Sequence, residues 1–492
     1  MENLFTFYDA IVLALYFAAT LGLGAMAIRK ASNIEGYTSA GGVLPGWLTG
    51  LSILGSFVSS ISFLALPGKA FASNWNAFVW GLSLPFATYI AVVYFVPFYR
   101  SLGNVSAYAH LETRFGAWAR IYAGICYLLT QLVRMGAVTY LMALPMNVLL
   151  GWNIFAVIIA TGLIVTIYTL FGGIVAVIWT EAIQTVVLIA GAIGCLILMF
   201  YSMPDGPMQI FDIAISHDKF SLGSFSITDF TTSTVWVLLI YGLFINLQNF
   251  GIDQNYVQRY ISTKSLREAR KSLWISGLTY LPLTLIFFLI GTSLFSFYTA
   301  YPDLLPNEYI NKPDYVFPYF IVSSLPTGVR GLLIAAIFAA AMSTISCSLN
   351  SSATIIFSDY YKRYFNAEAT EKQAMRFIKI ATSIWGILGT LIALGFTAAY
   401  NALDAWWILA GIFSGGMLGL FLLGLVFKEK SNSSAAAIAV ILGISLIAYL
   451  TLSPYCSFLP DLGFSPLLIP VFGTSLIFVS GFILTKFFCS KL

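Results

Sequence analysis

One face of an otherwise apolar stretch at 338–350, FAAAMSTISCSLN, carries a stripe of small polar residues. They stand at i, i+3, i+4 and i+7, the spacing of one helix face, and are Ser343, Ser346, Cys347 and Asn350. In lipid a hydroxyl finds no water to bond, so this face is expected to point into protein or a solvated cavity. Close packing between helices is the other use of such residues, and this stretch alone leaves both interpretations open.

A second stretch, GWLTGLSILGSFVSSISFLALPG at 46–68, is rich in glycine and serine and would make a poor uninterrupted helix. A span that breaks inside the membrane frees backbone carbonyls, which can coordinate a cation. Sodium is a hard ion and prefers oxygen ligands. Such a site could combine the carbonyls of Gly55 and Val58 with the hydroxyls of Ser343 and Thr344. Tight packing around small residues is again the alternative.

Arg134 stands in the middle of a long apolar run, LLTQLVRMGAVTYLMAL. An unpaired guanidinium is costly in such surroundings, so it needs an anionic partner. A carboxylate of the protein or of a substrate would suit its bidentate fork. Glu181, near the start of another span, could pair with Arg134, serve an ion site, or cap its own helix through the helix dipole.

Amide and aromatic side chains add candidates for a solute pocket. Asn246 and Gln248 interrupt the apolar run LLIYGLFINLQNFG, where their amides could face a solute or satisfy a local break. Phe57 and Phe78 are expected to pack against neighbouring helices rather than to act as lids.

The composition is that of a membrane protein, because 59% of the 492 residues are hydrophobic and 9% are charged. Five scattered cysteines and two histidines form no disulfide framework or zinc pattern. The net charge of +4 is not gathered into a basic patch, so nothing indicates nucleic acid. No nucleophile–base pair suggests an enzyme, and nothing indicates an obligatory protein partner. We expect an integral protein of the lipid bilayer.

Apolar runs long enough to cross a bilayer recur about thirteen times. The expected spans are roughly 8–28, 47–66, 76–98, 118–148, 153–171, 174–202, 233–250, 272–300, 327–358, 376–397, 403–427, 434–453 and 463–487. Lysine and arginine gather in alternate loops, including a group from Arg259 to Lys271. The positive-inside rule then predicts an outer N-terminus and a cytoplasmic C-terminus, and the absence of outer glycosylation sequons fits a bacterial inner membrane. The long outer loops at 203–232 and 301–326 have room for short gate helices.

Four runs resemble the sodium/solute symporter family. They are SAYAHLETRFG, GGIVAVIWTEAIQ, DQNYVQRYIS and GLLIAAIFAAAMSTISCSLNS, and they occur in family order along the chain. Within the family, the bacterial sodium/sialic acid symporters look nearest. The resemblance implies an all-α fold of two inverted five-helix repeats with broken first helices, here 47–202 and 233–427. One extra helix at 8–28 and two at 434–487 complete a single transmembrane domain of residues 1–492.

Carried over by position, the family's main sodium site uses three carbonyls and two hydroxyls, those of Gly55, Val58, Ala340, Ser343 and Thr344. The resemblance also implies an additional sodium site of the sialic acid branch, formed by Ser343 with Glu181, Ser346 and Cys347. The additional site departs from the family pattern, because glutamate replaces an aspartate and cysteine replaces a serine. Sulfur is a poor sodium ligand, so a second ion is the weaker expectation.

The solute pocket implied by the resemblance departs from the family as well. Arg134 keeps the position of the arginine that binds the carboxylate of sialic acid, and Ser59 and Ser62 keep pocket hydroxyls. Phe57 stands where a threonine is expected and Gly81 where a glutamine is expected, so the wall is more apolar. We expect a sodium-driven symporter that imports a small organic anion by alternating access, with sialic acid as one candidate. The alternatives are a symporter of neutral sugars or amino acids, and a membrane sensor without coupled transport.

Overall fold

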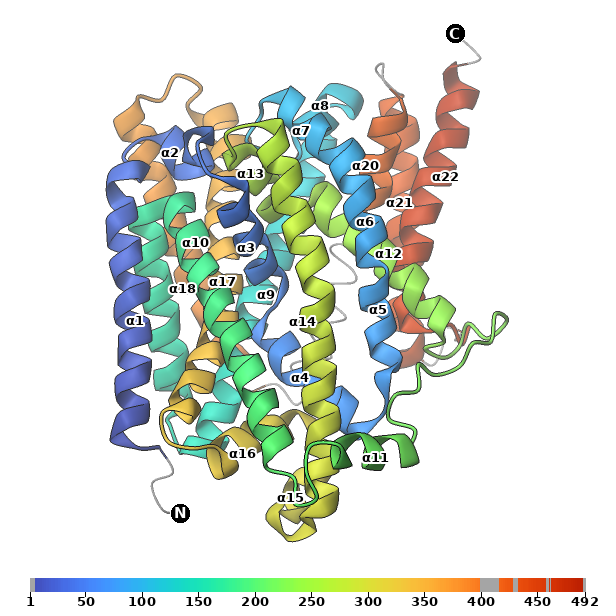
Figure 1. Ribbon diagram of the computed structural model, residues 1–492. Coiled ribbons are helices and arrows are strands. Elements are labelled where there is room, and N and C mark those ends of the chain that lie inside the picture. Colours follow the sequence, from blue (N-terminus) through green and yellow to red (C-terminus); the bar gives the residue numbers. More distant parts are fainter. Residues whose placement is uncertain (1–4, 399–415, 428–431, 457–459, 461, 490–492) are drawn as a thin grey trace.

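The computed structural model describes residues 5–398, 416–427, 432–456, 460 and 462–489. The regular structure of these residues is helical, and Figure 1 shows the long helices standing side by side in a bundle. In the first half of the chain they are α1 (Phe7–Ala27), α2 (Ile34–Ser39), α3 (Gly46–Phe57), α4 (Ser60–Ala72), α5 (Val79–Leu82), α6 (Leu84–Ile90), α7 (Val96–Leu102), α8 (Ala109–Phe115), α9 (Ala117–Leu150), α10 (Ile154–Tyr201) and α11 (Gln209–Ser216). In the second half they are α12 (Val235–Ile252), α13 (Gln254–Ser262), α14 (Leu266–Ala300), α15 (Asn307–Ile310), α16 (Pro313–Ser324), α17 (Val329–Ile355), α18 (Glu371–Phe396), α20 (Met417–Val426), α21 (Ser433–Leu452) and α22 (Ile469–Cys489). The expected all-α fold is confirmed.

Ten helical segments of the described chain are long and apolar enough to cross a bilayer, and the bent pair of α3 and α4 makes an eleventh. α10 has 48 residues, about 70 Å of helix, which exceeds the roughly 30 Å of hydrocarbon in a bilayer. It is bent at Gly173, where φ is 51° and where a Cβ atom would lie 2.7 Å from the carbonyl oxygen of Tyr37. α10 therefore contains the two spans expected at 153–171 and 174–202. The count of thirteen stays a prediction, because the span at 403–427 is described only in part.

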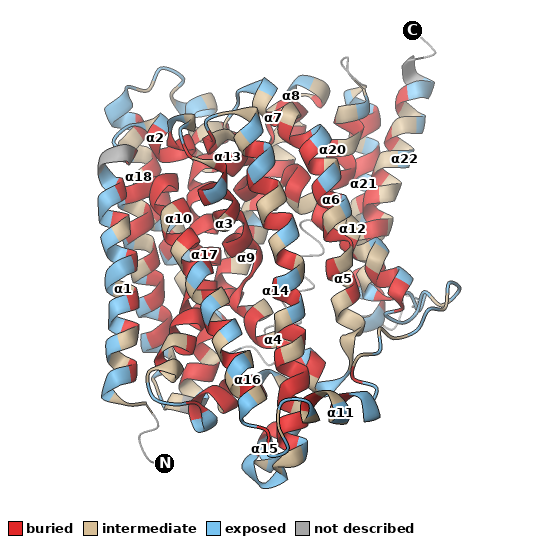
Figure 2. Cartoon of the chain, viewed as in Figure 1, coloured by how far each residue is buried: buried red, intermediate tan, exposed pale blue. Residues whose placement is uncertain are grey.

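α17 lies at the centre of the bundle. Of its most apolar window, 94% is buried inside the protein, and it contacts α1, α3, α9 and α10. Figure 2 shows buried residues along α17 and α3, whereas α1 presents many exposed residues to the outside. At the start of α17 the carboxylate of Asp9 accepts the backbone N–H groups of Gly328 and Gly331, at 2.8 and 2.9 Å, as a helix N-terminus favours. The polar stripe of α17 therefore faces protein rather than lipid.

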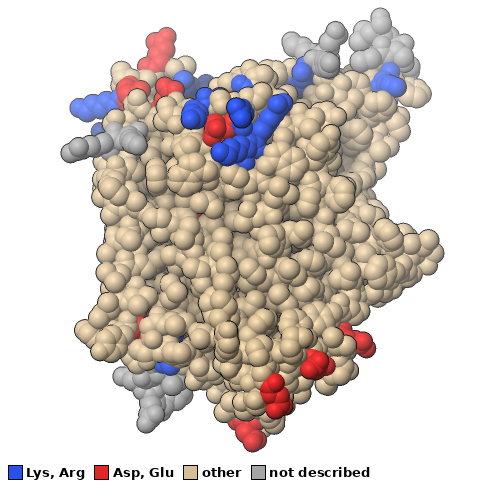
Figure 3. All heavy atoms as spheres, in the orientation of Figure 1, with Lys and Arg blue, Asp and Glu red and all other residues tan. Residues whose placement is uncertain are grey.

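Charged side chains lie mainly at the two ends of the bundle. Figure 3 shows most of the visible lysine and arginine at the upper end, together with some acidic side chains, and a row of acidic side chains at the lower end near α11 and α15. The segment between α13 and α14 and the first turns of α14 carry Lys264, Arg267, Arg270 and Lys271. Arg259 does not belong to this surface group. It is 1% exposed within α13, so the prediction that it is a loop residue is wrong.

The two long loops contain short helices, as expected. α11 lies within 203–232, and α15 and α16 lie within 301–326. Figure 1 places all three at the lower end, where α1 begins. From the first of these loops, the Nζ atom of Lys219 donates hydrogen bonds to the carbonyl oxygens of Phe71 and Ser73, at 2.7 and 2.9 Å. Because the carbonyl end of a helix is negative, this lysine ties the loop to the end of α4.

Candidate sodium and solute site

The candidate site is built around the break between α3 and α4. α3 ends at Phe57, and Val58 has extended backbone angles, with φ −91° and ψ 102°. Ser59 is also extended, and its hydroxyl accepts the backbone N–H of Ser62 at 3.4 Å, which starts α4. The two halves are bent by 55°. The break expected from the glycine and serine content is confirmed, and the last carbonyls of α3 are left outside the helical ladder.

Four of the five residues expected at the main sodium site are joined by hydrogen bonds, one of which links α17 to α3. Ser343 Oγ donates to the carbonyl oxygen of Gly55 at 2.9 Å and to that of Ala340 at 3.1 Å. Thr344 Oγ1 donates to the carbonyl oxygen of Ala340 at 3.2 Å. Val58, the fifth residue, is buried at the break. Because hydroxyl groups rotate, these neutral oxygens can turn their lone pairs toward a cation, and their chemistry fits sodium.

Gly55 allows α3 to approach α10 closely. A Cβ atom at this position would lie 2.4 Å from Thr185 Oγ1, which itself donates to the carbonyl oxygens of Leu51 and Glu181 at 3.0 and 2.8 Å. A larger residue would separate the two helices and move the Gly55 carbonyl away from α17. Close helix packing and coordination of an ion by the Gly55 carbonyl would therefore both require glycine at this position.

Glu181, on the second half of α10, forms a buried ion pair with Arg259 of α13. Arg259 Nη2 lies 2.8 Å from Oε1 and 2.7 Å from Oε2 of the carboxylate, and its Nε donates to Ser52 Oγ at 2.8 Å. The hydroxyls of Ser52 and Ser56 donate to the same carboxylate. Both carboxylate oxygens thus have partners from α3 and α13, which is what a buried charge requires. Glu181 does have an arginine partner, but it is Arg259 and not Arg134.

Ser346 and Cys347 form hydrogen bonds within their own helix. Ser346 Oγ donates to the carbonyl oxygen of Ser343, and Cys347 Sγ to that of Thr344, both at 3.1 Å. The carboxylate of Glu181 and the guanidinium of Arg259 both act electrostatically at Cys347, with opposite signs. Because the two charges form an ion pair, they offer a cation beside these two side chains little net attraction.

Arg134 reaches from α9 toward the break. Among the described residues its guanidinium makes one hydrogen bond, from Nη2 to the carbonyl oxygen of Ser56 at 3.4 Å. The half-buried carboxylate of Asp253 acts on it electrostatically. Asp253, however, accepts hydrogen bonds from Gln131 Nε2 at 3.4 Å and from the backbone N–H two residues further along the chain. Most of the five N–H donors of Arg134 therefore have no hydrogen-bond partner among the described residues, and the guanidinium lies at the negative end of α3.

Two of the remaining pocket candidates, Asn246 and Phe78, contact side chains other than Arg134. Asn246 Nδ2 donates to Ser83 Oγ at 3.0 Å, so its amide joins α12 to the junction of α5 and α6. Gln248 is half-buried two residues further along α12. The ring of Phe78 packs against that of Phe288, with centroids 5.6 Å apart, as expected of a packing residue. These contacts favour structural roles for Asn246 and Phe78.

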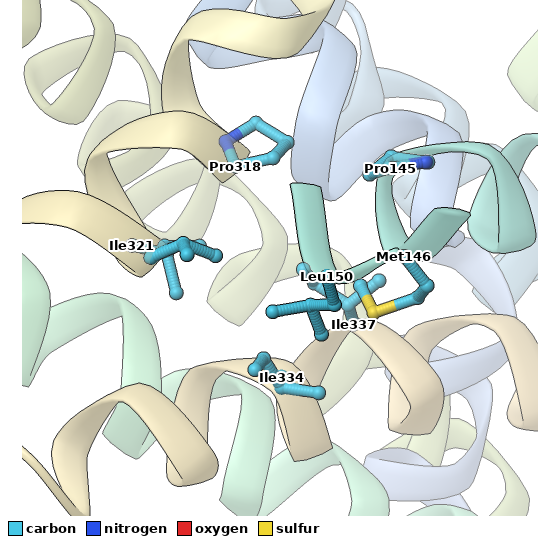
Figure 4. Close-up of a pocket in the computed structure, with 8 residues that line it drawn as sticks. Pro145, Met146, Leu150, Pro318, Ile321, Ile334 and Ile337 are labelled. Carbon is cyan, nitrogen blue, oxygen red and sulfur yellow. The ribbon is translucent and has the colours of Figure 1, made fainter. Parts of the chain in front are cut away.

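A small apolar cavity lies apart from the break, between α9, α16 and α17 (Figure 4). It is lined by Pro145, Met146, Leu150, Pro318, Ile321, Val322, Ile334 and Ile337. Its volume is about 10 Å³, room for roughly one water molecule, and no polar side chain lines it to hold one. This cavity offers no chemistry for a solute.

The sequence profile of the "Sodium:solute symporter family" matches residues 37–443. The chain belongs to this family. The matched residues begin in α2 and end in α21, so they include the break, the polar stripe, Arg134 and Arg259 of the symporter.

Individual relatives of the symporter agree with the family assignment. A sodium/sialic acid symporter of Proteus mirabilis is 36% identical over 449 residues, covering 91% of this chain and 89% of that protein. One of Aliivibrio fischeri is 33% identical over 486 residues, covering 98% and 94%. A solved structure of a Na+-coupled sialic acid symporter, in a substrate-bound outward-open state, matches with a TM-score of 0.91 at 32% identity over 98% of each chain. This chain is therefore a sodium-coupled membrane transporter of a small organic solute that works by alternating access, and not an enzyme.

Sequence reasoning missed the role of Arg259 in the symporter. Counting charges between spans treats every lysine and arginine there as exposed, although Arg259 lies in the run DQNYVQRYIS that carried the resemblance. The signal that could have found it is Glu181, since a carboxylate deep in the bundle requires a cationic partner. Ser52, which bonds to both members of the pair, carried no signal beyond the serine content of α3.

Proposed function

We propose that this symporter imports an organic anion whose carboxylate binds Arg134, while sodium binds at the site of Gly55, Val58, Ala340, Ser343 and Thr344. The observation that carries the proposal is that the Arg134 guanidinium makes one hydrogen bond within the described residues, to the Ser56 carbonyl at 3.4 Å. Ser56 is the neighbour of Gly55, whose carbonyl bonds to Ser343. Sodium and solute would thus both stabilise the break between α3 and α4, so that each raises the affinity for the other.

The first candidate solute is sialic acid, because the relatives of highest identity reported above are named sodium/sialic acid symporters. Ser59 and Ser62 at the start of α4 would be the hydroxyls nearest to the solute, with Phe57 and Gly81 forming part of its wall. At Gly81 an added Cβ atom would meet Thr284 Cγ2 at 3.8 Å, an ordinary contact, so the position is open toward α14.

We further propose that one sodium ion accompanies each solute. The carboxylate of Glu181, the strongest ligand of the second candidate site, is already neutralised by Arg259 at 2.7 Å. Ser346 and Cys347 would offer one hydroxyl and one sulfur, a weak donor set for a hard cation. Glu181 in this proposal holds α3, α10 and α13 together beside the ion rather than binding an ion itself.

The arrangement in the membrane follows from the same charges. The basic segment around the start of α14 supports a cytoplasmic position for the upper end in Figure 3, and hence an outer N-terminus in a bacterial inner membrane. We propose that residues 47–202 and 233–427 are the two inverted repeats. The break of α3 and α4 near the start of the first repeat fits that arrangement.

Uptake into proteoliposomes tests the function. Radiolabelled sialic acid is offered with and without an inward sodium gradient to the wild type, Arg134→Ala and, as a matched control, Arg267→Ala at an exposed site. Sodium-dependent uptake that is lost only in Arg134→Ala is the expected result. Undiminished uptake in Arg134→Ala would exclude the anchor, and uptake without sodium would exclude the coupling. If the wild type takes up no sialic acid, a panel of other acids replaces it in the same assay.

A further inference from the structure

α12 and α13 meet at a second break, and Asp253 is the residue between them. Its backbone is extended, with φ −75° and ψ 120°, so α12 ends at Ile252 and α13 begins at Gln254. The Asp253 side chain accepts the backbone N–H of Asn255 at 2.8 Å and thereby caps α13. The second break therefore fixes one half-buried carboxylate at a defined place inside the bundle.

One face of α9 contacts both breaks. Gln131 Nε2 donates to Asp253 Oδ2 at 3.4 Å, and Arg134 Nη2 donates to the carbonyl oxygen of Ser56, at the end of α3, also at 3.4 Å. Gln131 and Arg134 are three residues apart, so they share this face of the helix. The Gln131 amide is itself held, because its Oε1 accepts the hydroxyl of Ser348 of α17 at 2.6 Å. α9 thus places the Arg134 guanidinium beside the end of α3 and beside Asp253.

Asp253 has capacity for more hydrogen bonds than it makes inside the protein. Oδ1 accepts the Asn255 N–H and Oδ2 accepts the Gln131 amide, whereas a carboxylate can accept about four hydrogen bonds. Arg134 is the first cation acting on Asp253, ahead of Arg259. The Asp253 carboxylate can therefore accept N–H groups of the Arg134 guanidinium and still cap α13.

Asp253 also lies on the side of Arg134 toward which an imported solute leaves. α8, which leads into α9, lies at the upper end of the bundle, proposed above to be cytoplasmic (Figure 1). Gln131 precedes Arg134 by nearly one turn of α9, so Gln131 and the carboxylate bonded to it are nearer that end. A solute carboxylate on Arg134 and the Asp253 carboxylate require the same N–H donors.

We propose that Asp253 is a positioning residue that competes with the solute for the Arg134 guanidinium and takes it over when the solute leaves toward the cytoplasm. The inference rests on the proposed function, in which Arg134 anchors the solute carboxylate, and adds the group that limits how tightly the solute is held. Tight binding and fast release are then opposed, because the acceptor that weakens binding also speeds dissociation.

The test is Asp253→Asn, since asparagine caps a helix about as well as aspartate and only the charge is lost. Asp212→Asn, the same change at an exposed site of α11, is the matched control. Binding of radiolabelled sialic acid is measured on the full-length symporter in detergent with sodium, and sodium-driven uptake into proteoliposomes gives KM and the maximal rate. If uptake identifies another acid as the solute, that acid is used in both assays.

We expect Asp253→Asn to bind the acid about tenfold more tightly, as for a guanidinium that Asp253 engages about nine-tenths of the time. KM and the maximal rate should both fall, by roughly five- to tenfold, because release becomes slow. Asp212→Asn should stay within about twofold of wild type on every measure. Unchanged or weaker binding in Asp253→Asn would overturn the inference, and so would tighter binding with an undiminished maximal rate.

A double variant separates action through the arginine from direct repulsion of the solute. Arg134→Ala with Asp253→Asn should bind the acid no more tightly than Arg134→Ala alone, and a further gain would contradict the positioning role. Should Asp253→Asn fail to fold, Gln131→Leu decides. It removes the amide partner of a still charged Asp253, so the guanidinium should shift toward Asp253 and binding should weaken about threefold. Unchanged or stronger binding in Gln131→Leu would then refute the competition.

Failure of this inference is distinguishable from failure of the proposed function. If no acid binds in a manner that depends on Arg134, the proposed function is wrong and the competition has no basis. If binding depends on Arg134 but is not strengthened in Asp253→Asn, only the role of Asp253 is wrong.

Discussion

Arg134 and Arg259 are two guanidinium groups in the interior of the same bundle, close to the same half-helix, and their surroundings are opposite. Arg259 is 1% exposed and bonds to Glu181, to Ser52 and to a backbone carbonyl of its own helix. Arg134 has one hydrogen bond within the described part of the chain, a long one to a backbone carbonyl. Neither position can hold a charge without compensation. Arg259 is compensated by a direct ion pair, whereas Arg134 has the carboxylate of Asp253 as a charge neighbour without a hydrogen bond to it, and we infer that the solute completes the pairing.

The comparison indicates how the protein separates stability from binding. The pair of Glu181 and Arg259 links α10 to α13, and Ser52 adds α3 to the same network. Arg134 bonds to the end of α3 and leaves its fork open. A fully paired charge can hold neighbouring helices together, whereas a partly paired charge can still form hydrogen bonds with a ligand.

The largest effect is expected from breaking the internal pair. Arg259→Gln leaves the Glu181 carboxylate buried and unpaired, which should cost about 3–5 kcal/mol of stability. Thermal unfolding in detergent, with the yield of monodisperse protein, measures the loss. The double variant Glu181→Gln and Arg259→Gln should recover most of it, because no lone charge remains. A wild-type melting temperature for the single variant would refute the internal pairing.

Removing the guanidinium of Arg134 should lower the affinity for the solute without lowering the stability of the fold. In Arg134→Ala the melting temperature should stay within a few degrees of wild type, while solute affinity falls by about 2–3 kcal/mol, roughly 30- to 150-fold. Arg134→Lys serves as a control that keeps the charge but loses the bidentate fork, and its affinity should lie between the two. If Arg134→Ala instead unfolds as readily as Arg259→Gln, the distinction between the two arginines is wrong.

The next largest effect is expected at the proposed sodium site. Ser343→Ala removes the hydroxyl that bonds to Gly55 at 2.9 Å. It should raise the sodium concentration for half-maximal uptake about tenfold, as expected for one lost charge–dipole contact. Thr344→Ser, which keeps its hydroxyl, is the matched control and should remain close to wild type. An unchanged sodium dependence in Ser343→Ala would place the ion elsewhere.

The smallest effect is expected at Cys347. Its sulfur bonds to the Thr344 carbonyl within α17, and a serine hydroxyl can do the same. Cys347→Ser should therefore change uptake by less than about twofold and leave the Hill coefficient for sodium near one. A coefficient that rises toward two would mean that a hydroxyl at this position completes a second ion site despite the charge on Arg259.

Features that depend on local sequence could be predicted. The break after Phe57 follows from glycine and serine between 46 and 62, because these residues weaken a helix and Ser59 can cap a new one. α10 bends at Gly173, between the two spans expected at 153–171 and 174–202. The position of Arg134 within the bundle could be expected from its apolar flanks, and the polar stripe of α17 from its helical spacing.

Partners that lie far apart in the chain could not be predicted. Glu181 and Arg259 are 78 residues apart, and the sequence around each of them does not indicate that the other is its partner. Asn246 was a candidate for solute contact, yet its amide bonds to Ser83 of a distant helix. In the same way, no local pattern distinguishes Phe57, which lies among four rings, from Phe78, which packs near the lower end.

The sequence by itself therefore determined the membrane class, the broken first helix and the need of each buried charge for a partner, and it supplied the oxygens that we propose for sodium. These follow from hydropathy, periodicity and the cost of a charge in lipid, all of which act along a short segment. Tertiary structure alone decided which charge is satisfied inside the protein and which is left for a ligand. That choice depends on which helices meet, since a hydrogen bond requires an approach of about 3 Å that spacing along the chain cannot specify.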